Sequence, residues 1–273
     1  MDHYKLTIVI VSHGSRRPQS CLEFQSFFDQ LSAHLKQTNP QVRLLHGFIE
    51  IQNPSVEETL NIACQFEDPI HVIPLSLFSA THVKKDIPRF IANTLRRHPN
   101  AQITSDEAIG PHPFMAELCR RRLQPFLKNT SSKDTALVLV GRGSNDPEAN
   151  RDFMKLSCMI SDKTGIETII HCFSGITKPD IPAGLLEAAY LRHPNIIIMP
   201  YLLFTGVLLE RLIKNQEDFA ASHPHIHVER ANHLGADNSL HSYILSSIDS
   251  FINEAQKSHQ SFLGTDLFPD PCL

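Results

Sequence analysis

The segment TIVIVSHGS, Thr7–Ser15, decides the fold, because a close variant of it, ALVLVGRGS, recurs at Ala136–Ser144. In each copy five apolar or β-branched residues run into a short turn that contains glycine. An apolar run of this length that ends at a turn is typical of a strand buried on both faces of a parallel sheet. The two stretches therefore predict the same buried strand, followed by the same kind of loop, at two places in the chain.

Three further pairs of segments extend this repeat along the chain. HGFIEIQNP (His46–Pro54) matches HCFSGITKP (His171–Pro179), IHVIPLSLF (Ile70–Phe78) matches IIIMPYLLF (Ile196–Phe204), and His98-Pro99 matches His223-Pro224. Taken in chain order, the four offsets are 129, 125, 126 and 125 residues. Matches in one order at a nearly constant offset indicate an internal duplication, and this period is too long for a solenoid repeat.

Within each half, apolar runs alternate with helical periodicities. We expect strands at 6–11, 42–51, 70–77, 102–109, 136–140, 168–173, 196–203 and 227–231. Strands that alternate with helices form parallel sheets through right-handed crossovers. The sequence thus predicts an α/β protein of two tandem domains, each a parallel sheet flanked by helices. The domains would span 1–129 and 134–257, joined by the polar stretch KNTSSKD (Lys128–Asp134), with an irregular tail at 258–273.

Composition excludes several functional classes. The chain carries 25 Lys and Arg against 29 Asp and Glu, a formal net charge of −4, which disfavours a nucleic-acid binder. No apolar run approaches the roughly 18 residues of a membrane span, and Leu6–Val11 lacks the flanks of a signal peptide. The six cysteines contain no C-x-x-C pair, which argues against a disulfide framework or an iron–sulfur signature. We expect a cytoplasmic protein with reduced thiols and no membrane or nucleic-acid partner.

The 16 histidines suggest metal chemistry, because histidine is the commonest metal ligand. Ligands of open α/β sheets bind at the carboxyl ends of the strands. There the first half places His13 after its first strand, Glu50 near the end of its second and His82 beyond its third. Adjacent strands lie about 4.8 Å apart, so the three side chains can converge on one ion. Two imidazoles and one carboxylate suit Fe²⁺, Co²⁺, Ni²⁺ or Zn²⁺ and leave coordination positions open for a substrate.

The second half lacks all three candidate ligands. At the matching positions His13 becomes Arg142, Glu50 becomes Gly175 and His82 becomes Leu208, while the apolar framework is retained. The joint loss indicates one metal site, in the first half, and another role for the second half. The alternative is that three unrelated surface residues diverged independently.

Basic residues gather near the same strand ends. Arg16, Lys84 and Arg142 are candidates for binding the carboxylates of an anionic ligand in a cleft between the domains, because guanidinium and ammonium groups pair with carboxylates. Arg17, Lys85, Arg89 and Arg211 lie in the same stretches. For Lys84, Lys85 and Arg89 a solvated helix face is the alternative. His46, His171 and His223 recur with the repeat or have a counterpart in it, which favours structural roles, and His112 is expected to begin a helix.

Five motifs surround these residues: VSHGSR (Val11–Arg16), FIEIQNPSVEE (Phe48–Glu58), PLSLFSATHVKKDIP (Pro74–Pro88), GRGSNDPEANRDF (Gly141–Phe153) and PYLLFTG (Pro200–Gly206). Together they resemble the class II chelatases of the sirohydrochlorin cobaltochelatase and ferrochelatase (CbiX/SirB) family. The resemblance extends to about residue 255 and is to the long, internally duplicated type. It implies two chelatase-like domains.

The resemblance also implies an activity. The family are metal chelatases, classed as lyases, which insert Co²⁺ or Fe²⁺ (with Ni²⁺ possible in vitro) into the octacarboxylate tetrapyrrole sirohydrochlorin, without ATP, in cobalamin or siroheme biosynthesis. His13 and His82 would bind the metal and act in catalysis, with Glu50 as a third ligand. Longer relatives can carry a histidine-rich tail and a cysteine motif for an iron–sulfur cluster. This chain has neither, since Cys272 stands alone in its tail, so we expect no such cluster. We also expect a monomer.

The chemistry of insertion fits these residues. Two pyrrole protons must leave the macrocycle and the metal must lose its hydration shell, and a neutral histidine can serve as both ligand and base. We expect His13 and His82 to hold the metal facing the ring, and one of them, assisted by Glu50, to accept protons. Two alternatives remain open. One is a non-catalytic metal or tetrapyrrole carrier, and the other is a protoporphyrin ferrochelatase, which would need an apolar membrane-facing lip that this sequence does not show.

Overall fold

The computed structural model describes residues 5–79, 82–128, 130–175, 177–235 and 238–264. The first half contains β1 (Leu6–Ser12), α1 (Pro18–Thr38), β2 (Val42–Phe48), α2 (Val56–Cys64), β3 (Ile70–Pro74), η1 (His82–Asp86), α3 (Ile87–Arg97), β4 (Ile103–Ser105) and α4 (Pro113–Leu127). The second contains η2 (Ser132–Asp134), β5 (Thr135–Gly141), α5 (Pro147–Thr164), β6 (Thr168–Phe173), α6 (Ile181–Tyr190), β7 (Asn195–Pro200), α7 (Val207–Ser222), β8 (His227–Arg230) and α8 (Asn238–Gly264). Within these residues, none of the helices combines the length and the apolar character that crossing a bilayer requires.

Each half forms a four-stranded parallel sheet, as the repeat predicts, with the orders β2-β1-β3-β4 and β6-β5-β7-β8. The central strands β1 and β5 are buried along their whole length, which explains their unbroken apolar sequences. Their registers are also equivalent, because Ser12 lies opposite Phe48 and Gly141 lies opposite Phe173. The same offsets of 129 and 125 residues that relate the sequence segments therefore relate the paired strands.

Several strands end before the apolar runs that predicted them. β2 ends at Phe48, β3 at Pro74, β4 at Ser105 and β7 at Pro200, so the expected ends at 51, 77, 109 and 203 were too late. The reason is that the apolar residues continue into loops. Leu75 and Leu202 are buried although they lie outside the strands, and both line a cavity between the domains.

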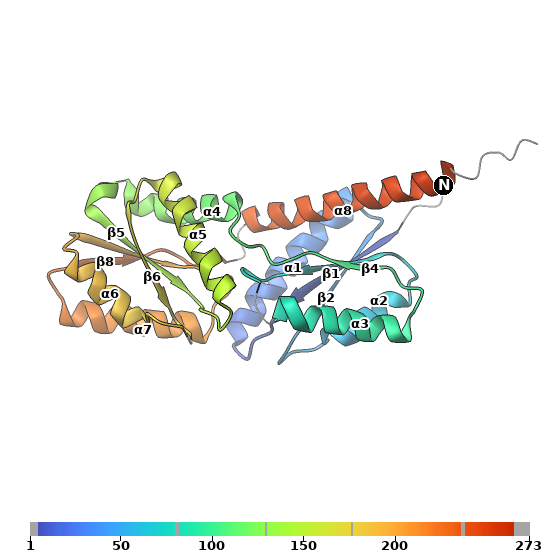
Figure 1. Cartoon of the computed structure of the whole chain (residues 1–273), viewed down its shortest axis with the longest axis horizontal. Helices are drawn as coiled ribbons and strands as arrows, with labels where there is room; N and C mark the ends of the chain where they lie inside the picture. Colours follow the sequence, from blue (N-terminus) through green and yellow to red (C-terminus); the bar gives the residue numbers. More distant parts are fainter. Residues whose placement is uncertain (1–4, 80–81, 129, 176, 236–237, 265–273) are drawn as a thin grey trace, which may run out of the picture.

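The last helix of each half packs against the other half (Figure 1). α4 lies beside α5, and Lys163 of α5 is 3.6 Å from Glu117 of α4. α8 runs along the first domain, where the ring of His241 stacks on Phe27 of α1 with 4.4 Å between ring centroids. The two helices are therefore exchanged between the domains.

This exchange changes the expected domain limits. The stretch 128–134 does separate the two sheets in the chain, but each sheet is covered in part by a helix from beyond that boundary. One apolar cluster joins residues of α1, α4, α5 and α8, among them Phe27, Leu118, Leu156 and Ile248. The prediction of an irregular tail was wrong for residues 258–264. There α8 continues to Gly264, because no proline or glycine interrupts it earlier. The remainder, 265–273, lies outside the described residues.

Candidate functional site

Three side chains singled out by the sequence meet at the carboxyl edge of the first sheet. His13 follows β1, Glu50 follows β2, and His82 begins η1, the turn between β3 and α3. Their ligand atoms all lie within 4.8 Å of one another. The strand order reverses between β1 and β3, so this edge is the switch point at which open α/β sheets bind ligands. The arrangement provides two imidazoles and one carboxylate for a metal ion.

A close approach of two loops brings His13 and Glu50 together. The Glu50 N–H donates to the His13 carbonyl at 3.1 Å, which extends the pairing of β1 and β2 beyond the strands. Gly14 has a φ of +90°, and a Cβ there would lie 2.1 Å from the Glu50 carbonyl oxygen. Only glycine permits both the conformation and the approach. The glycine of SHGS is therefore part of the geometry of the site.

A second carboxylate orients His82. In the π-helical turn η1, Oδ2 of Asp86 lies 2.8 Å from Nδ1 of His82. Asp86 also pairs with the guanidinium of Arg89 at 2.9 Å. Because Nδ1 is engaged, Nε2 is the nitrogen left for a metal, an arrangement that fixes the tautomer and orientation of many metal-binding histidines. Asp86 was not among the residues predicted from the sequence, although its spacing of four residues from His82 on a helical turn was a usable signal.

The surroundings of His13 favour its neutral form. Burial lowers the pKa of His13, and the neighbouring Arg142 guanidinium and His82 imidazole lower it further, while Glu50 acts in the opposite direction. The two imidazole rings stand perpendicular, with 4.8 Å between their centroids. A lowered pKa leaves the imidazole unprotonated near neutral pH, which is the form that binds a metal or accepts a proton.

Two of the three side chains, His13 and His82, line a large cavity between the domains, and the carboxylate of Glu50 lies within 4.8 Å of their ring nitrogens without being part of the lining. The volume of the cavity is about 1040 Å³, at the upper end of the range for small-molecule sites. Both halves contribute walls. Apolar side chains dominate these walls, and the arginines that reach them are Arg16, Arg17, Arg142 and Arg211. The cavity thus combines apolar surface with guanidinium groups, which suits a large anionic ligand.

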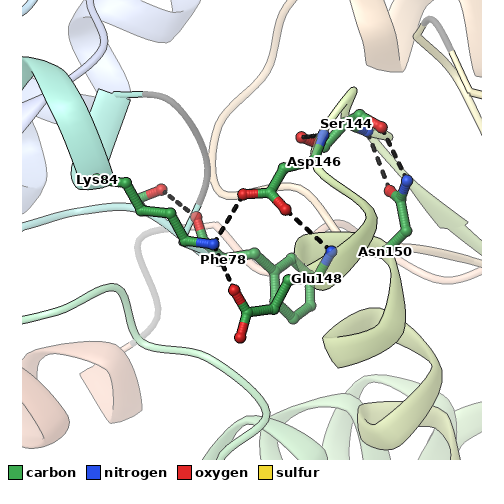
Figure 2. Close-up of polar contacts among 7 residues, drawn as sticks. Phe78, Lys84, Ser144, Asp146, Glu148 and Asn150 are labelled. Atoms are coloured by element: carbon green, nitrogen blue, oxygen red, sulfur yellow. Dashed lines mark hydrogen bonds and ion pairs between the residues drawn. The ribbon is translucent and has the colours of Figure 1, made fainter.

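Lys84 lies outside the described lining of this cavity. Figure 2 shows its ammonium between two carboxylates of the second half, with Nζ 2.8 Å from Oδ2 of Asp146 and 2.5 Å from Oε2 of Glu148. Asp146 is the N-cap of α5 and also accepts from the Glu148 N–H at 3.0 Å. The charge of Lys84 is therefore used to join the two domains, and the geometry gives no support to its predicted role in binding substrate carboxylates.

A second ion pair joins the domains, and its two residues occupy the positions that correspond, in the internal repeat, to Asp146 and Lys84. Nη2 of Arg17 lies 2.7 Å from Oε2 of Glu210. Arg17 precedes α1 as Asp146 precedes α5, at an offset of 129 residues, and Lys84 corresponds to Glu210 at an offset of 126. The two pairs occupy equivalent places with their charges exchanged.

The equivalent edge of the second sheet has no room for a side chain at the position that corresponds to Glu50. A Cβ at Gly175, the counterpart of Glu50, would lie 2.3 Å from the Arg142 carbonyl oxygen, so the backbone there leaves no room for a side chain. The hydroxyl of Ser174 donates to the Leu208 carbonyl at 2.8 Å. In the part of the chain that the structure describes, the one group of three candidate metal ligands lies in the first half.

The histidines that the sequence assigned to structural roles have them. The ring of His46 lies 4.5 Å from that of Phe28, and Nε2 of His171 lies 2.7 Å from Oγ of Ser157. His112 is the N-cap of α4, as expected. These histidines stabilise the fold through packing, hydrogen bonding or capping rather than contributing to the metal-binding group.

Comparisons with known proteins lead to one family. The family model CbiX matches the chain twice, at residues 7–125 and 136–250. The sirohydrochlorin cobaltochelatase of Priestia megaterium is 31% identical over 238 residues, covering 85% of this chain and 76% of that protein. The sirohydrochlorin ferrochelatase of Bacillus subtilis (strain 168) is 27% identical over 226 residues, covering 82% and 84% respectively. A solved structure of the sirohydrochlorin chelatase SirB from Bacillus subtilis subspecies spizizenii, in complex with cobalt, is similar with a TM-score of 0.73 at 27% identity, covering 89% of this chain and 93% of that one.

Proposed function

This chain belongs to the CbiX family, and we propose that it is a metal chelatase that inserts a divalent metal ion into sirohydrochlorin without ATP. The observation that carries the proposal is the convergence of His13, Glu50 and His82 within 4.8 Å at the cavity between the domains. The names of the relatives, a cobaltochelatase and a ferrochelatase, support the reaction and its substrate. The proposed ion is Co²⁺ or Fe²⁺, because the relatives are named a cobaltochelatase and a ferrochelatase and both ions accept imidazole and carboxylate ligands.

The three side chains hold the incoming ion. His82 binds through Nε2, since its Nδ1 is engaged by Asp86 at 2.8 Å. His13 and Glu50 complete a set of three protein ligands, which leaves positions on the ion for the nitrogens of the macrocycle. An ion held on one side faces the ring with its open side, and this positioning makes the encounter effectively unimolecular.

The same residues take the protons that the ring must lose. His13 has a lowered pKa and is therefore neutral and able to accept a pyrrole proton near neutral pH. Glu50 lies next to it and stabilises the imidazolium that forms. As a ring nitrogen replaces His13 on the ion, the freed imidazole nitrogen accepts one pyrrole proton. The second pyrrole proton passes through the exposed carboxylate of Glu50 to solvent as the remaining metal–nitrogen bonds form.

Arginines around the cavity bind the carboxylates of the substrate. Arg16, Arg142 and Arg211 line the cavity, and a guanidinium can bind a carboxylate through two parallel hydrogen bonds. Arg17 also lines the cavity, but it is paired with Glu210 of the other domain. Because one chain supplies both walls, we propose that the enzyme is active as a monomer. The proposal also takes the enzyme to be cytoplasmic and to use no iron–sulfur cluster.

A metallation assay tests the proposal. Purified protein is mixed with sirohydrochlorin and Co²⁺, Fe²⁺ (anaerobically) or Ni²⁺, without nucleotide, and the absorbance of the macrocycle is followed. We expect the protein to accelerate the spectral change well above the rate without protein, and the ratio of the Co²⁺ and Fe²⁺ rates measures the preference for the ion. Binding of sirohydrochlorin or metal without acceleration would instead identify a carrier.

A further inference from the structure

Ile51 has an unusual backbone at the wall of the cavity. Its φ of 72° places it in the left-handed region, which steric clashes disfavour for a β-branched residue. The Gln52 N–H donates to the Glu50 carbonyl at 2.8 Å, which closes a three-residue turn around Ile51. Turns of this kind with positive φ are rare and strained. The strain lies directly beside Glu50, one of the candidate metal ligands.

Packing inside the protein does not account for this strain. The side chain of Ile51 is 51% exposed, and it belongs to none of the apolar clusters found among the described residues. Glycine would adopt the same φ without steric cost, and the chain uses glycine for positive φ at Gly14, Gly110, Gly143, Gly165 and Gly235. We therefore infer that the strained backbone is retained because the Ile51 side chain has a function, and that this side chain contacts a group that is not part of the protein core.

The location of the side chain indicates what it contacts. Ile51 lines the cavity, and so does Val207 at the start of α7, which is 49% exposed. The two half-exposed apolar side chains come from different domains and share the cavity with the arginines. A tetrapyrrole has apolar ring faces and a charged rim, so this combination of surfaces is complementary to it.

We propose that Ile51 is a substrate-binding residue that packs against the face of the tetrapyrrole and holds it over the metal-binding side chains. This inference rests on the proposed function, because it takes sirohydrochlorin as the ligand. The strained turn presents an apolar side chain next to Glu50, so the ring is held where the ion must enter it. Covering the exposed part of an isoleucine side chain is expected to contribute about tenfold to affinity.

Three variants of the full chain test this proposal. Ile51→Gly removes the side chain and relieves the strain, Ile51→Val keeps a β-branched apolar side chain, and Glu67→Gly relieves the φ of 59° at a site outside the cavity lining. Metal-free sirohydrochlorin is titrated into each protein and binding is followed by absorbance. Thermal unfolding and Co²⁺ binding without sirohydrochlorin are measured in parallel.

We expect Ile51→Gly to weaken sirohydrochlorin binding about tenfold, with an unfolding temperature at or above that of the wild type and unchanged Co²⁺ affinity. Ile51→Val and Glu67→Gly should bind sirohydrochlorin within about twofold of the wild type. Wild-type affinity in Ile51→Gly, a clearly lower unfolding temperature, or equal weakening in Glu67→Gly would overturn the proposal. Because these titrations need no metal insertion, they are independent of the metallation assay, and a wild type that binds but does not insert metal would overturn the proposed function alone.

Discussion

At the carboxyl edge of the first sheet, Gly14 in the loop after β1 lies against the backbone carbonyl of residue 50. Because the glycine provides the space for this approach, residue 50 itself can have a side chain, and it is a glutamate. At the same edge of the second sheet both loops carry glycine, and Gly175 faces the Arg142 carbonyl at a distance that a Cβ could not occupy. The two crossings are built on equivalent strands in equivalent register. The candidate metal-binding edge therefore differs from its counterpart in the position where the close approach requires glycine. In the first sheet this position is Gly14, after β1, and in the second it is Gly175, after β6.

The same comparison explains what the second half contributes. Its counterpart of His13 is Arg142, which lines the cavity and lowers the pKa of His13 through its charge. One copy of the fold thus supplies the ligands, and the other supplies a cation that faces them. Together the two edges form the walls of a single cavity, which neither half could form alone.

The largest expected effect comes from removing the ligands of the first half. His13→Ala and His82→Ala should each lower the rate of metal insertion at least about 100-fold, because each removes a ligand and a candidate proton acceptor. Leu208→Ala, at the position equivalent to His82, is the matched change in the second half and should retain most of the rate. Rates near the wild type in both histidine variants would contradict the assignment.

Asp86 should have the next largest effect. Asp86→Ala is expected to raise the KM for Co²⁺ about 10-fold to 100-fold with a smaller change in kcat, because His82 loses the group that orients it. Asp86→Asn should recover part of this loss, since the amide oxygen still accepts a hydrogen bond from Nδ1. Arg89→Ala, which removes the more exposed partner of Asp86, is the control and should change the KM little. Equal KM values for Asp86→Ala and the wild type would exclude a positioning role.

Alanine at the two crossing glycines compares the halves directly. Gly14→Ala and Gly175→Ala should each lower the free energy of unfolding by about 1–3 kcal/mol, because each Cβ meets a backbone carbonyl and, at Gly14, a positive φ. Only Gly14→Ala should also displace Glu50 and strongly reduce metal insertion. Denaturant unfolding and the metallation assay measure the two effects, and equal losses of activity would show that the edges are not functionally distinct.

The smallest effect is expected from the ion pairs between the domains. Lys84→Met and Arg17→Met should each lower the unfolding temperature slightly at low ionic strength, and the differences should vanish at high salt, because exposed pairs are screened. Lys84→Met should leave the KM for sirohydrochlorin unchanged, whereas Arg142→Ala should raise it. A raised KM in Lys84→Met would restore Lys84 as a group that binds the substrate.

The sheets, and the meeting of His13, Glu50 and His82 at one edge, could be predicted because they depend on local patterns. The buried runs that form β1 and β5 specify central strands, and the residues that follow β1, β2 and β3 must meet where parallel strands end. The joint replacement of these three residues in the second half predicts that the metal site lies in the first half, and the Co²⁺ titration described below tests this prediction.

The exchange of the closing helices could not be predicted in this way. α4 and α8 are both amphipathic, and an apolar face does not specify which of two similar sheets it covers. The pairing of Lys84 with Asp146 and Glu148 could not be predicted either, because these partners are distant in sequence and come close only through the arrangement of the domains. The strain at Ile51 also has no sequence signal, since an apolar residue after Glu50 continues the pattern of the strand.

The most direct test of a single metal-binding edge is a titration of the full chain with Co²⁺ alone, followed by the visible absorption of the bound ion. The wild type should bind one Co²⁺ per chain, and the double variant His13→Ala with His82→Ala should bind none at the same concentrations. Two ions per chain, or one ion still bound in the double variant, would contradict the assignment of metal binding to the first half.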